Sequence, residues 1–160
     1  MKALFKTILV GAVLAMAGVA VGAAAGDPVV GTWTLNVAKS KFDAGQAAFK
    51  SQTRIYTADS DGISVTVKGE AADGTAVSQQ STFKYDNKAY AWTGAADYDA
   101  VSLKRVNGST VNAILMKGGK TVGTTKRTIS GHGKVLTLSS QITGADGKAY
   151  SVVLVFDKQS

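Results

Sequence analysis

The sequence predicts an all-β protein, an antiparallel up-and-down meander that closes into a barrel of about 8–10 strands. Turn dipeptides such as Asp61-Gly62 and Asn107-Gly108 recur at spacings that are mostly 11–15 residues. The segments between them alternate apolar and polar side chains, and no stretch after residue 26 sustains a helical repeat. Closure into a barrel is favoured because it removes the edge strands of a long meander. A two-layer sandwich of the same strands is the alternative architecture.

The expected strands follow one another with tight turns between them. Asp-Gly and Asn-Gly suit these turns because type I′ hairpins need a positive φ at both central positions. Ile63, Val65 and Val67 share one face of their segment, which predicts a sheet with one dry side. One short turn of helix fits between residues 38 and 49. The strands are expected at residues 29–37, 50–58, 63–70, 75–85, 88–93, 98–106, 109–117, 120–130, 134–143 and 148–157.

Residues 1–25 have the pattern of a cleaved signal peptide rather than of a folded segment. Lys2 and Lys6 precede an uncharged apolar stretch, and Ala23-Ala24-Ala25 provides a small-residue cleavage site before Gly26. A retained membrane anchor is the alternative, although the many alanines and glycines favour removal. We therefore expect a periplasmic or secreted protein with no stable membrane insertion after cleavage. Its single β-barrel domain would span residues 26–160.

Composition excludes several classes of protein. The chain has 160 residues, enough for one domain, and no cysteine, which excludes a disulfide scaffold and thiolate metal sites. Its formal net charge is +7, and Lys2 and Lys6 account for two of the eighteen basic side chains. The remaining basic residues are scattered, with no run longer than a pair such as Lys126-Arg127. We expect no nucleic-acid partner, because such proteins concentrate their charge on one face.

The first expected strand carries a Gly-x-Trp motif, Gly31-Thr32-Trp33. Its position near the start of an exported all-β chain resembles that of the lipocalins and the wider calycin superfamily. The resemblance implies that Gly31 lets the chain bend into the strand and that Trp33 fills the floor of the barrel. Over residues 28–158 the chain resembles the small exported bacterial lipocalin-like proteins.

The C-terminal strands resemble those of the intracellular fatty-acid-binding proteins. The likeness rests on residues 124–127, a glycine turn, and the segments KVLTLSSQ and SVVLVFDK. In that family an arginine at the position matching Arg127 points inward and holds a fatty-acid carboxylate. The family's Arg-x-Tyr pair is replaced here by Leu154 and Phe156, and its helix pair is missing, since only residues 38–48 separate the first two strands.

Three arginines are candidates for the polar anchor of a ligand or for a structural role: Arg54, Arg105 and Arg127. Arg105 shares its parity with Val101 and Leu103, which would aim it at the dry face, where an unpaired charge is costly. It could bind an anion, lie at the rim, or stack on Trp33, a role that Arg127 could also fill. The parity of Arg127 leaves its direction open. Arg54 alternates with Ile55 and is expected outside.

Four aromatic residues surround the longest gap between turns and form the remaining candidate site: Tyr85, Tyr90, Trp92 and Tyr98. At a barrel mouth such side chains would offer apolar contact and a polar handle to a ligand. The alternative is that they complete the core around an irregular connection.

Catalysis, a metal and a cofactor are not expected. His132 is the sole histidine and lies between two glycines of a turn, and the aspartates fall in turns, where they bond their own backbone. The sequence therefore predicts a non-enzymatic barrel that binds a small hydrophobic or amphipathic ligand in its interior. The alternative is a filled barrel that acts through its outer surface as an envelope structural or interaction protein. A cavity of a few hundred Å³ would separate the two.

Overall fold

The computed structural model describes residues 26–43 and 49–160, and the predicted signal peptide, residues 1–25, lies outside them. Strands follow one another along this part of the chain, interrupted by the single 3-10 helix η1 (Val37–Lys39). The strands are β1 (Gly31–Leu35), β2 (Lys41–Phe42), β3 (Phe49–Asp59), β4 (Gly62–Ala71), β5 (Ala76–Phe83), β6 (Asp86–Thr93), β7 (Ala100–Arg105), β8 (Thr110–Lys117), β9 (Lys120–Ser130), β10 (Val135–Thr143) and β11 (Ala149–Lys158).

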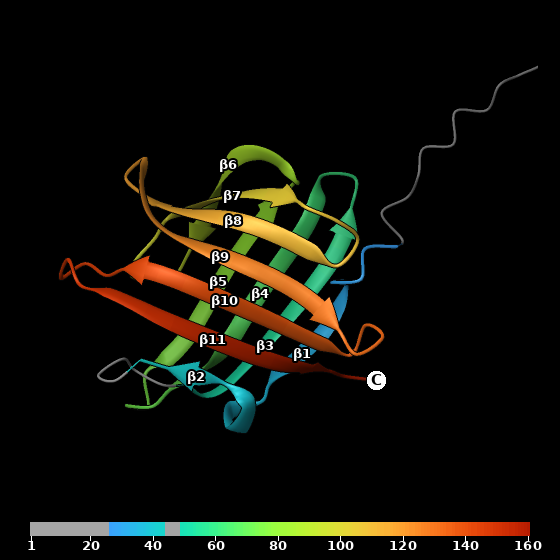
Figure 1. Ribbon diagram of the computed structural model, residues 1–160, viewed down its shortest axis with the longest axis horizontal. Coiled ribbons are helices and arrows are strands. Elements are labelled where there is room, and N and C mark those ends of the chain that lie inside the picture. The colour runs from blue at the N-terminus through green and yellow to red at the C-terminus, as the bar shows by residue number, and fades with distance from the viewer. Residues whose placement is uncertain (1–25, 44–48) are drawn as a thin grey trace, which may run out of the picture.

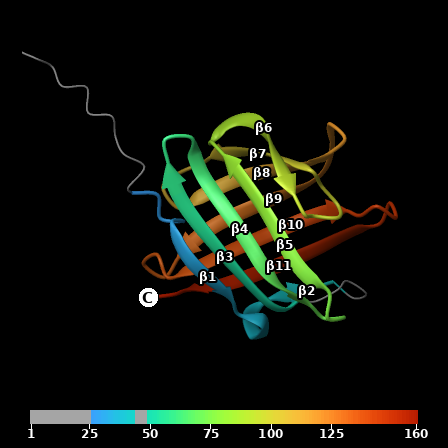
Figure 2. The same cartoon turned by 180° about the vertical axis from the view of Figure 1, so that it is seen from behind.

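The strands form one closed antiparallel sheet (Figures 1 and 2). From β3 to β11 each strand pairs with the next, and β1 pairs with both β3 and β11, so that the sheet closes. The short strand β2 pairs with β11 at Val152 and Val153, beside the stretch that β1 leaves open. The predicted up-and-down barrel is thus confirmed, with ten strands in the closed ring, and the sandwich alternative is wrong.

The period of two in the sequence puts apolar side chains inside the barrel. Ile63, Val65 and Val67 are all buried, as are Leu136 and Leu138 on the opposite wall. Their neighbours along each strand are mostly polar and face outward, as the alternation of a strand requires. The interior is therefore apolar apart from a few polar side chains, and those few define the candidate site.

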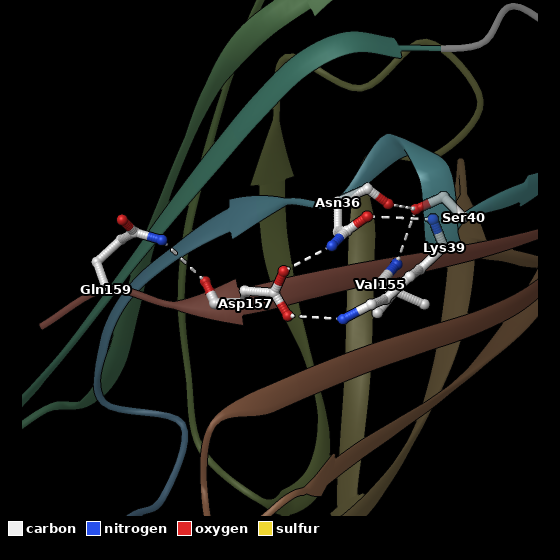
Figure 3. Close-up of polar contacts among 6 residues, drawn as sticks. All are labelled: Asn36, Lys39, Ser40, Val155, Asp157 and Gln159. Atoms are coloured by element: carbon white, nitrogen blue, oxygen red, sulfur yellow. Dashed lines mark hydrogen bonds and ion pairs between the residues drawn. The ribbon is translucent and has the colours of Figure 1, made fainter.

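The closing seam is held by side chains as well as by the β1–β11 ladder (Figure 3). Asn36 caps η1 by accepting a hydrogen bond from the Lys39 backbone N–H, and its amide donates to Asp157 Oδ2 at 2.7 Å. Ser40 Oγ accepts from the backbone N–H of Val155 at 3.0 Å. The hydrogen bond from Asn36 comes first among the causes that lower the pKa of the Asp157 carboxyl. The loop after β1 is thereby fixed to β11.

The two described ends of the chain lie at the same end of the barrel, which we call the terminal end (Figure 1). The Gln159 backbone N–H donates to the Thr32 carbonyl at 2.9 Å, which joins the C-terminal residues to β1. The turns after β4, β6, β8 and β10 lie at the opposite end. Within residues 26–43 and 49–160, no helix has the length and apolar character needed to cross a membrane.

Candidate functional site

The barrel encloses a cavity of about 350 Å³. This volume falls within the range of small-molecule sites, roughly 300–1,000 Å³. Most of its wall is apolar and comes from Phe83, Val101, Leu103, Val111, Leu115, Leu138, Ile142, Val152 and Leu154. Apolar walls of this kind bind ligands mainly through the hydrophobic effect.

The cavity reaches solvent at the opposite end of the barrel, where the lining side chains are aromatic. Phe42 and Phe49 lie with ring centroids 6.2 Å apart, and Trp92 and Tyr98 with centroids 5.7 Å apart. Ala96 also lines the cavity and is itself exposed, so the cavity lining extends to the surface of the protein there. Aromatic rings at this rim offer a large contact area to an entering apolar molecule.

The β6–β7 connection, residues 94–99, lies at this opening and is held at its centre by Asp97. Asp97 Oδ2 accepts a hydrogen bond of 2.6 Å from the Tyr150 hydroxyl on β11, and Oδ1 accepts from the Ala145 N–H at 3.4 Å. Burial and then this hydrogen bond raise the pKa of Tyr150, so that it keeps its proton. Lys117 Nζ adds a hydrogen bond to the Ala96 carbonyl at 3.1 Å. The connection is therefore hydrogen-bonded to side chains of both β11 and β8.

Arg54 lies inside the cavity, contrary to the expectation that it faces outward. Its side chain is 7% exposed, whereas Ile55 is 45% exposed. Arg54 Nε donates to Gln52 Oε1 at 2.9 Å, and the guanidinium lies 5.4 Å from the centroid of the Phe156 ring. The parity of β3 is the reverse of the one that Ile55 suggests, because Arg54 is paired with the inward-facing Trp33 of β1 and Val67 of β4.

Arg127 also lines the cavity and is 6% exposed. Its Nη2 donates to the Tyr85 hydroxyl at 2.6 Å, and the guanidinium lies 5.9 Å from the centroid of the Tyr56 ring. Its direction, which the sequence left open, is therefore inward. In the described part of the chain, no carboxylate lies within 4.0 Å of the guanidinium of either Arg54 or Arg127.

Arg105 lies at the terminal end, outside the main cavity. It forms an ion pair with Asp27, and its guanidinium lies 4.2 Å from the centroid of the Tyr85 ring. Burial tends to raise the pKa of Asp27, but hydrogen bonds from the Val29 N–H, Tyr85 and Arg105 outweigh it and hold the pKa below its ordinary value. Arg105 therefore has a carboxylate partner of its own and does not face the cavity.

The cation over the Trp33 ring is Lys158, so the alternative that Arg105 or Arg127 stacks on this ring is wrong. Lys158 Nζ lies 5.1 Å from the ring centroid. Trp33 is fully buried and donates a hydrogen bond from Nε1 to the Val29 carbonyl at 2.7 Å. A Cβ atom on Gly31 would lie 2.8 Å from Lys158 Cε, so the glycine makes room for this lysine. Gly31 and Trp33 both lie at the terminal end, and neither of them lines the cavity.

The four aromatic candidates divide into two pairs. Trp92 and Tyr98 line the cavity, whereas Tyr85 and Tyr90 do not. Tyr85 lies between Arg105 and Arg127, and burial raises its pKa to about 12. The Tyr90 hydroxyl donates to Asp86 Oδ2 at 2.9 Å in an exposed position. The structure thus brings Arg127, Trp92 and Tyr98 together and leaves Arg105, Tyr85 and Tyr90 outside the cavity.

Sequence reasoning missed the polar side chains that β3 and β5 direct into the cavity. Gln52 and Arg54 come from β3, and Gln79 comes from β5. The aromatic Tyr56 was the available signal for β3, because it shares the parity of Gln52 and Arg54. Across the described residues, no group of three or more His, Asp and Glu side chains is close enough together to hold a metal ion.

No protein-family model matches the chain, and no curated protein matches it by sequence. Solved structures do resemble it. The S-type phycobiliprotein lyase CPES from Guillardia theta has a TM-score of 0.53 at 12% identity, covering 83% of this chain and 89% of that one. Zebrafish ileal bile acid-binding protein complexed with cholic acid has a TM-score of 0.49 at 12% identity, covering 82% and 99%. A redesigned β-barrel, mFAP1, bound to DFHBI, has a TM-score of 0.43 at 15% identity, covering 84% and 98%. The likeness to the lyase structure shows the fold alone, and it agrees with the β-barrel that the sequence predicted.

Proposed function

We propose that this protein is a non-enzymatic barrel that binds a small amphipathic molecule in its interior. The observation that carries the proposal is the cavity of about 350 Å³, which has apolar walls and an aromatic rim. Burial of an apolar ligand against these walls would contribute about 25 cal/mol for each Å² removed from water. Buried polar groups such as Arg127 would fix the orientation of the ligand.

The alternative, a filled barrel that acts through its outer surface, requires a solid interior. The small side chains on one wall argue against it. Ala113, Thr125 and Ser140 come from three adjacent strands, β8 to β10, and all of them line the cavity. Larger residues at these positions would fill the space that the barrel leaves open.

An equilibrium titration with the neutral fluorophore N-phenyl-1-naphthylamine tests the proposal. Its emission rises in apolar surroundings, so binding inside the barrel is observed directly. The substitution Ala113→Phe places a ring in the cavity, while Ala91→Phe adds the same ring on the exposed face of β6. We expect one saturable site in the wild type and in Ala91→Phe, and at least about tenfold weaker binding in Ala113→Phe. Equal affinity in both variants would place the probe outside the cavity and contradict the proposal.

We also propose that the protein is exported and cleaved before Gly26. The support is the basic start at Lys2 and Lys6, the apolar stretch and the small residues that follow. N-terminal sequencing of the protein isolated from the cells that make it tests this directly. Gly26 as the first residue is the expected result, and a retained Met1 would contradict cleavage.

A further inference from the structure

Three polar side chains form a patch on one wall of the cavity: Gln52, Arg54 and Gln79. Arg54 on β3 is paired with Val67 on β4, and Val67 is paired with Gln79 on β5. Arg54 and Gln79 therefore lie in one row, two strands apart, with about 10 Å between their backbones. Gln52 lies two residues from Arg54 on the same face, and both of these side chains are buried. We call these three residues the polar patch.

The bonding partners of the two glutamines fix which way their amides point. Trp92 Nε1 lies 3.1 Å from Gln79 Oε1, and Arg54 Nε lies 2.9 Å from Gln52 Oε1. An indole N–H and a guanidinium N–H can only donate, so the carbonyl oxygen of each amide must face them. The carbonyl oxygen of each glutamine therefore accepts a hydrogen bond from the protein. The NH₂ group, which can only donate, is left for another partner.

The polar patch consequently offers donors to the cavity. Besides its Nε bond to Gln52, Arg54 forms no side-chain hydrogen bond within the described chain, and its two terminal nitrogens have no protein acceptor. In the same part of the chain, every fully buried side-chain nitrogen and oxygen has a partner. The unpaired nitrogens of the patch are therefore those that remain accessible from the cavity.

The charge of Arg54 has no counterpart beside it. Asp97 is the acidic residue that lines the cavity, and its oxygens accept from Tyr150 and the Ala145 N–H. Arg127, whose guanidinium also lines the cavity, donates one of its hydrogen bonds to the Tyr85 hydroxyl. A buried cation without a paired carboxylate is costly, and a bound anion would offset that cost.

We infer that the polar patch is the anchor for an organic anion, with the anionic group at Arg54 and its oxygens within reach of the glutamine NH₂ groups. This inference rests on the proposed function and specifies its ligand class. The apolar body of the ligand lies against the aliphatic wall, and the donors of the patch discriminate against a cation or a purely apolar molecule. Charge-assisted hydrogen bonds of this kind are the strong ones in proteins.

Two fluorophores with the same aromatic skeleton test this assignment. 1-Anilinonaphthalene-8-sulfonate carries a sulfonate, and N-phenyl-1-naphthylamine is the same molecule without it. We expect Arg54→Met to raise the Kd of the sulfonate by about tenfold or more and to leave that of the neutral probe within about twofold. Arg54→Lys, which keeps the charge, is expected to restore part of the sulfonate affinity.

A second variant tests the patch without removing Arg54. Gln79→Glu preserves the size of the side chain and an acceptor for Trp92, but it places a negative charge beside the expected anion. It is expected to weaken sulfonate binding selectively. The control is Lys126→Met, which removes one positive charge from the exposed face of β9 and is expected to change neither Kd. Thermal unfolding of each variant verifies that it is folded.

The outcomes separate this inference from the proposed function. Equal changes in the Kd values of both probes on Arg54→Met and Gln79→Glu, or no change in the sulfonate Kd, would overturn the anion anchor and leave interior binding standing. If neither probe binds the wild-type protein, interior binding fails and the anchor fails with it. Selective loss of the sulfonate in both variants would support the assignment.

Discussion

Arg127 Nη2 donates a hydrogen bond of 2.6 Å to the hydroxyl of Tyr85. This bond links the cavity, which Arg127 lines, to the terminal end, where Tyr85 stacks under Arg105 and Arg105 is paired with Asp27. Four side chains from separate parts of the chain are thereby coupled, and the cavity arginine is held in place from behind. A side chain held in this way presents its remaining donors in a fixed direction.

The substitution Tyr85→Phe removes the acceptor for Arg127 and the hydrogen bond to Asp27, and it keeps the ring under Arg105. We expect the free energy of unfolding to fall by about 1–3 kcal/mol, the cost of leaving a buried charged donor without its partner. Urea unfolding followed by tryptophan fluorescence measures this loss. Tyr90→Phe is the matched control, because the Tyr90 hydroxyl bonds to Asp86 in an exposed position. Equal losses in the two variants would contradict the buried role of the Tyr85 hydroxyl.

The stabilising effect of the Tyr85 hydroxyl should depend on pH in the alkaline range. Burial raises its pKa from 10.0 to about 12, so the folded protein holds this proton more tightly than the unfolded chain does. The contribution is therefore complete below pH 10.0 and is lost as pH rises towards about 12. The difference in unfolding free energy between wild type and Tyr85→Phe should shrink over that interval. A difference that stays constant through it would contradict the raised pKa.

Asn36 should contribute measurably to the free energy of unfolding, because it makes two hydrogen bonds at the seam where the barrel closes. It caps η1 and donates to Asp157, so Asn36→Ala removes both contacts (Figure 3). We expect a loss of about 1–2 kcal/mol in the free energy of unfolding. The pKa of Asp157 should rise in this variant, since the Asn36 hydrogen bond is the first cause of its lowering.

Carboxyl chemical shifts followed against pH measure the pKa, and urea unfolding measures the stability. Asn112→Ala is the control, because the Asn112 side chain is exposed on the outer face of β8. An Asp157 titration that is the same in wild type and Asn36→Ala would show that the seam contact does not persist in solution.

Gly94 should be intolerant of any side chain. Its φ is 85°, and a Cβ atom built on it would lie 2.0 Å from the Ser78 carbonyl oxygen, a backbone atom of the neighbouring strand β5. Gly94→Ala must therefore separate β5 from the end of β6, at a cost of about 2–4 kcal/mol.

Gly118→Ala isolates the backbone-strain part of this effect, so that its difference from Gly94→Ala gives the steric part. Gly118 also has a positive φ, 56°, but a Cβ there would meet nothing within 4 Å. Only the backbone strain of about 1–2 kcal/mol is expected from that variant. Thermal or urea unfolding compares the two substitutions, and equal losses would contradict the close approach at Gly94.

The barrel was predictable because its signals are local. Asp-Gly and Asn-Gly turns mark the hairpins, and the alternation of Ile63, Val65 and Val67 fixes which face of β4 is buried. Neither signal depends on distant residues. The short strand β2 was missed, since two residues are too few to show a period and its pairing with β11 comes from the far end of the chain.

The cavity residues were only partly predictable, and the reason is geometric. Alternation tells which face of a strand a side chain takes, but not its height along the barrel axis, which the stagger between strands sets. Arg105 has inward parity and yet lies at the terminal end beside Asp27. Arg54 was misplaced because the apolar Ile55 suggested the wrong parity, whereas the pairing with β1 and β4 decides it. Tyr85 lies between β5 and β6, where no strand parity applies.

The most direct test of interior binding is to identify what the protein carries when it is isolated from the cells that make it. Native mass spectrometry of the wild-type protein and of Ala113→Phe, purified side by side, provides the comparison. We expect one organic molecule bound in a one-to-one ratio to the wild type and absent from Ala113→Phe, since its ring occupies the cavity. The same bound mass on both proteins, or a wild type that carries nothing and takes up no added amphipathic molecule, would contradict the account.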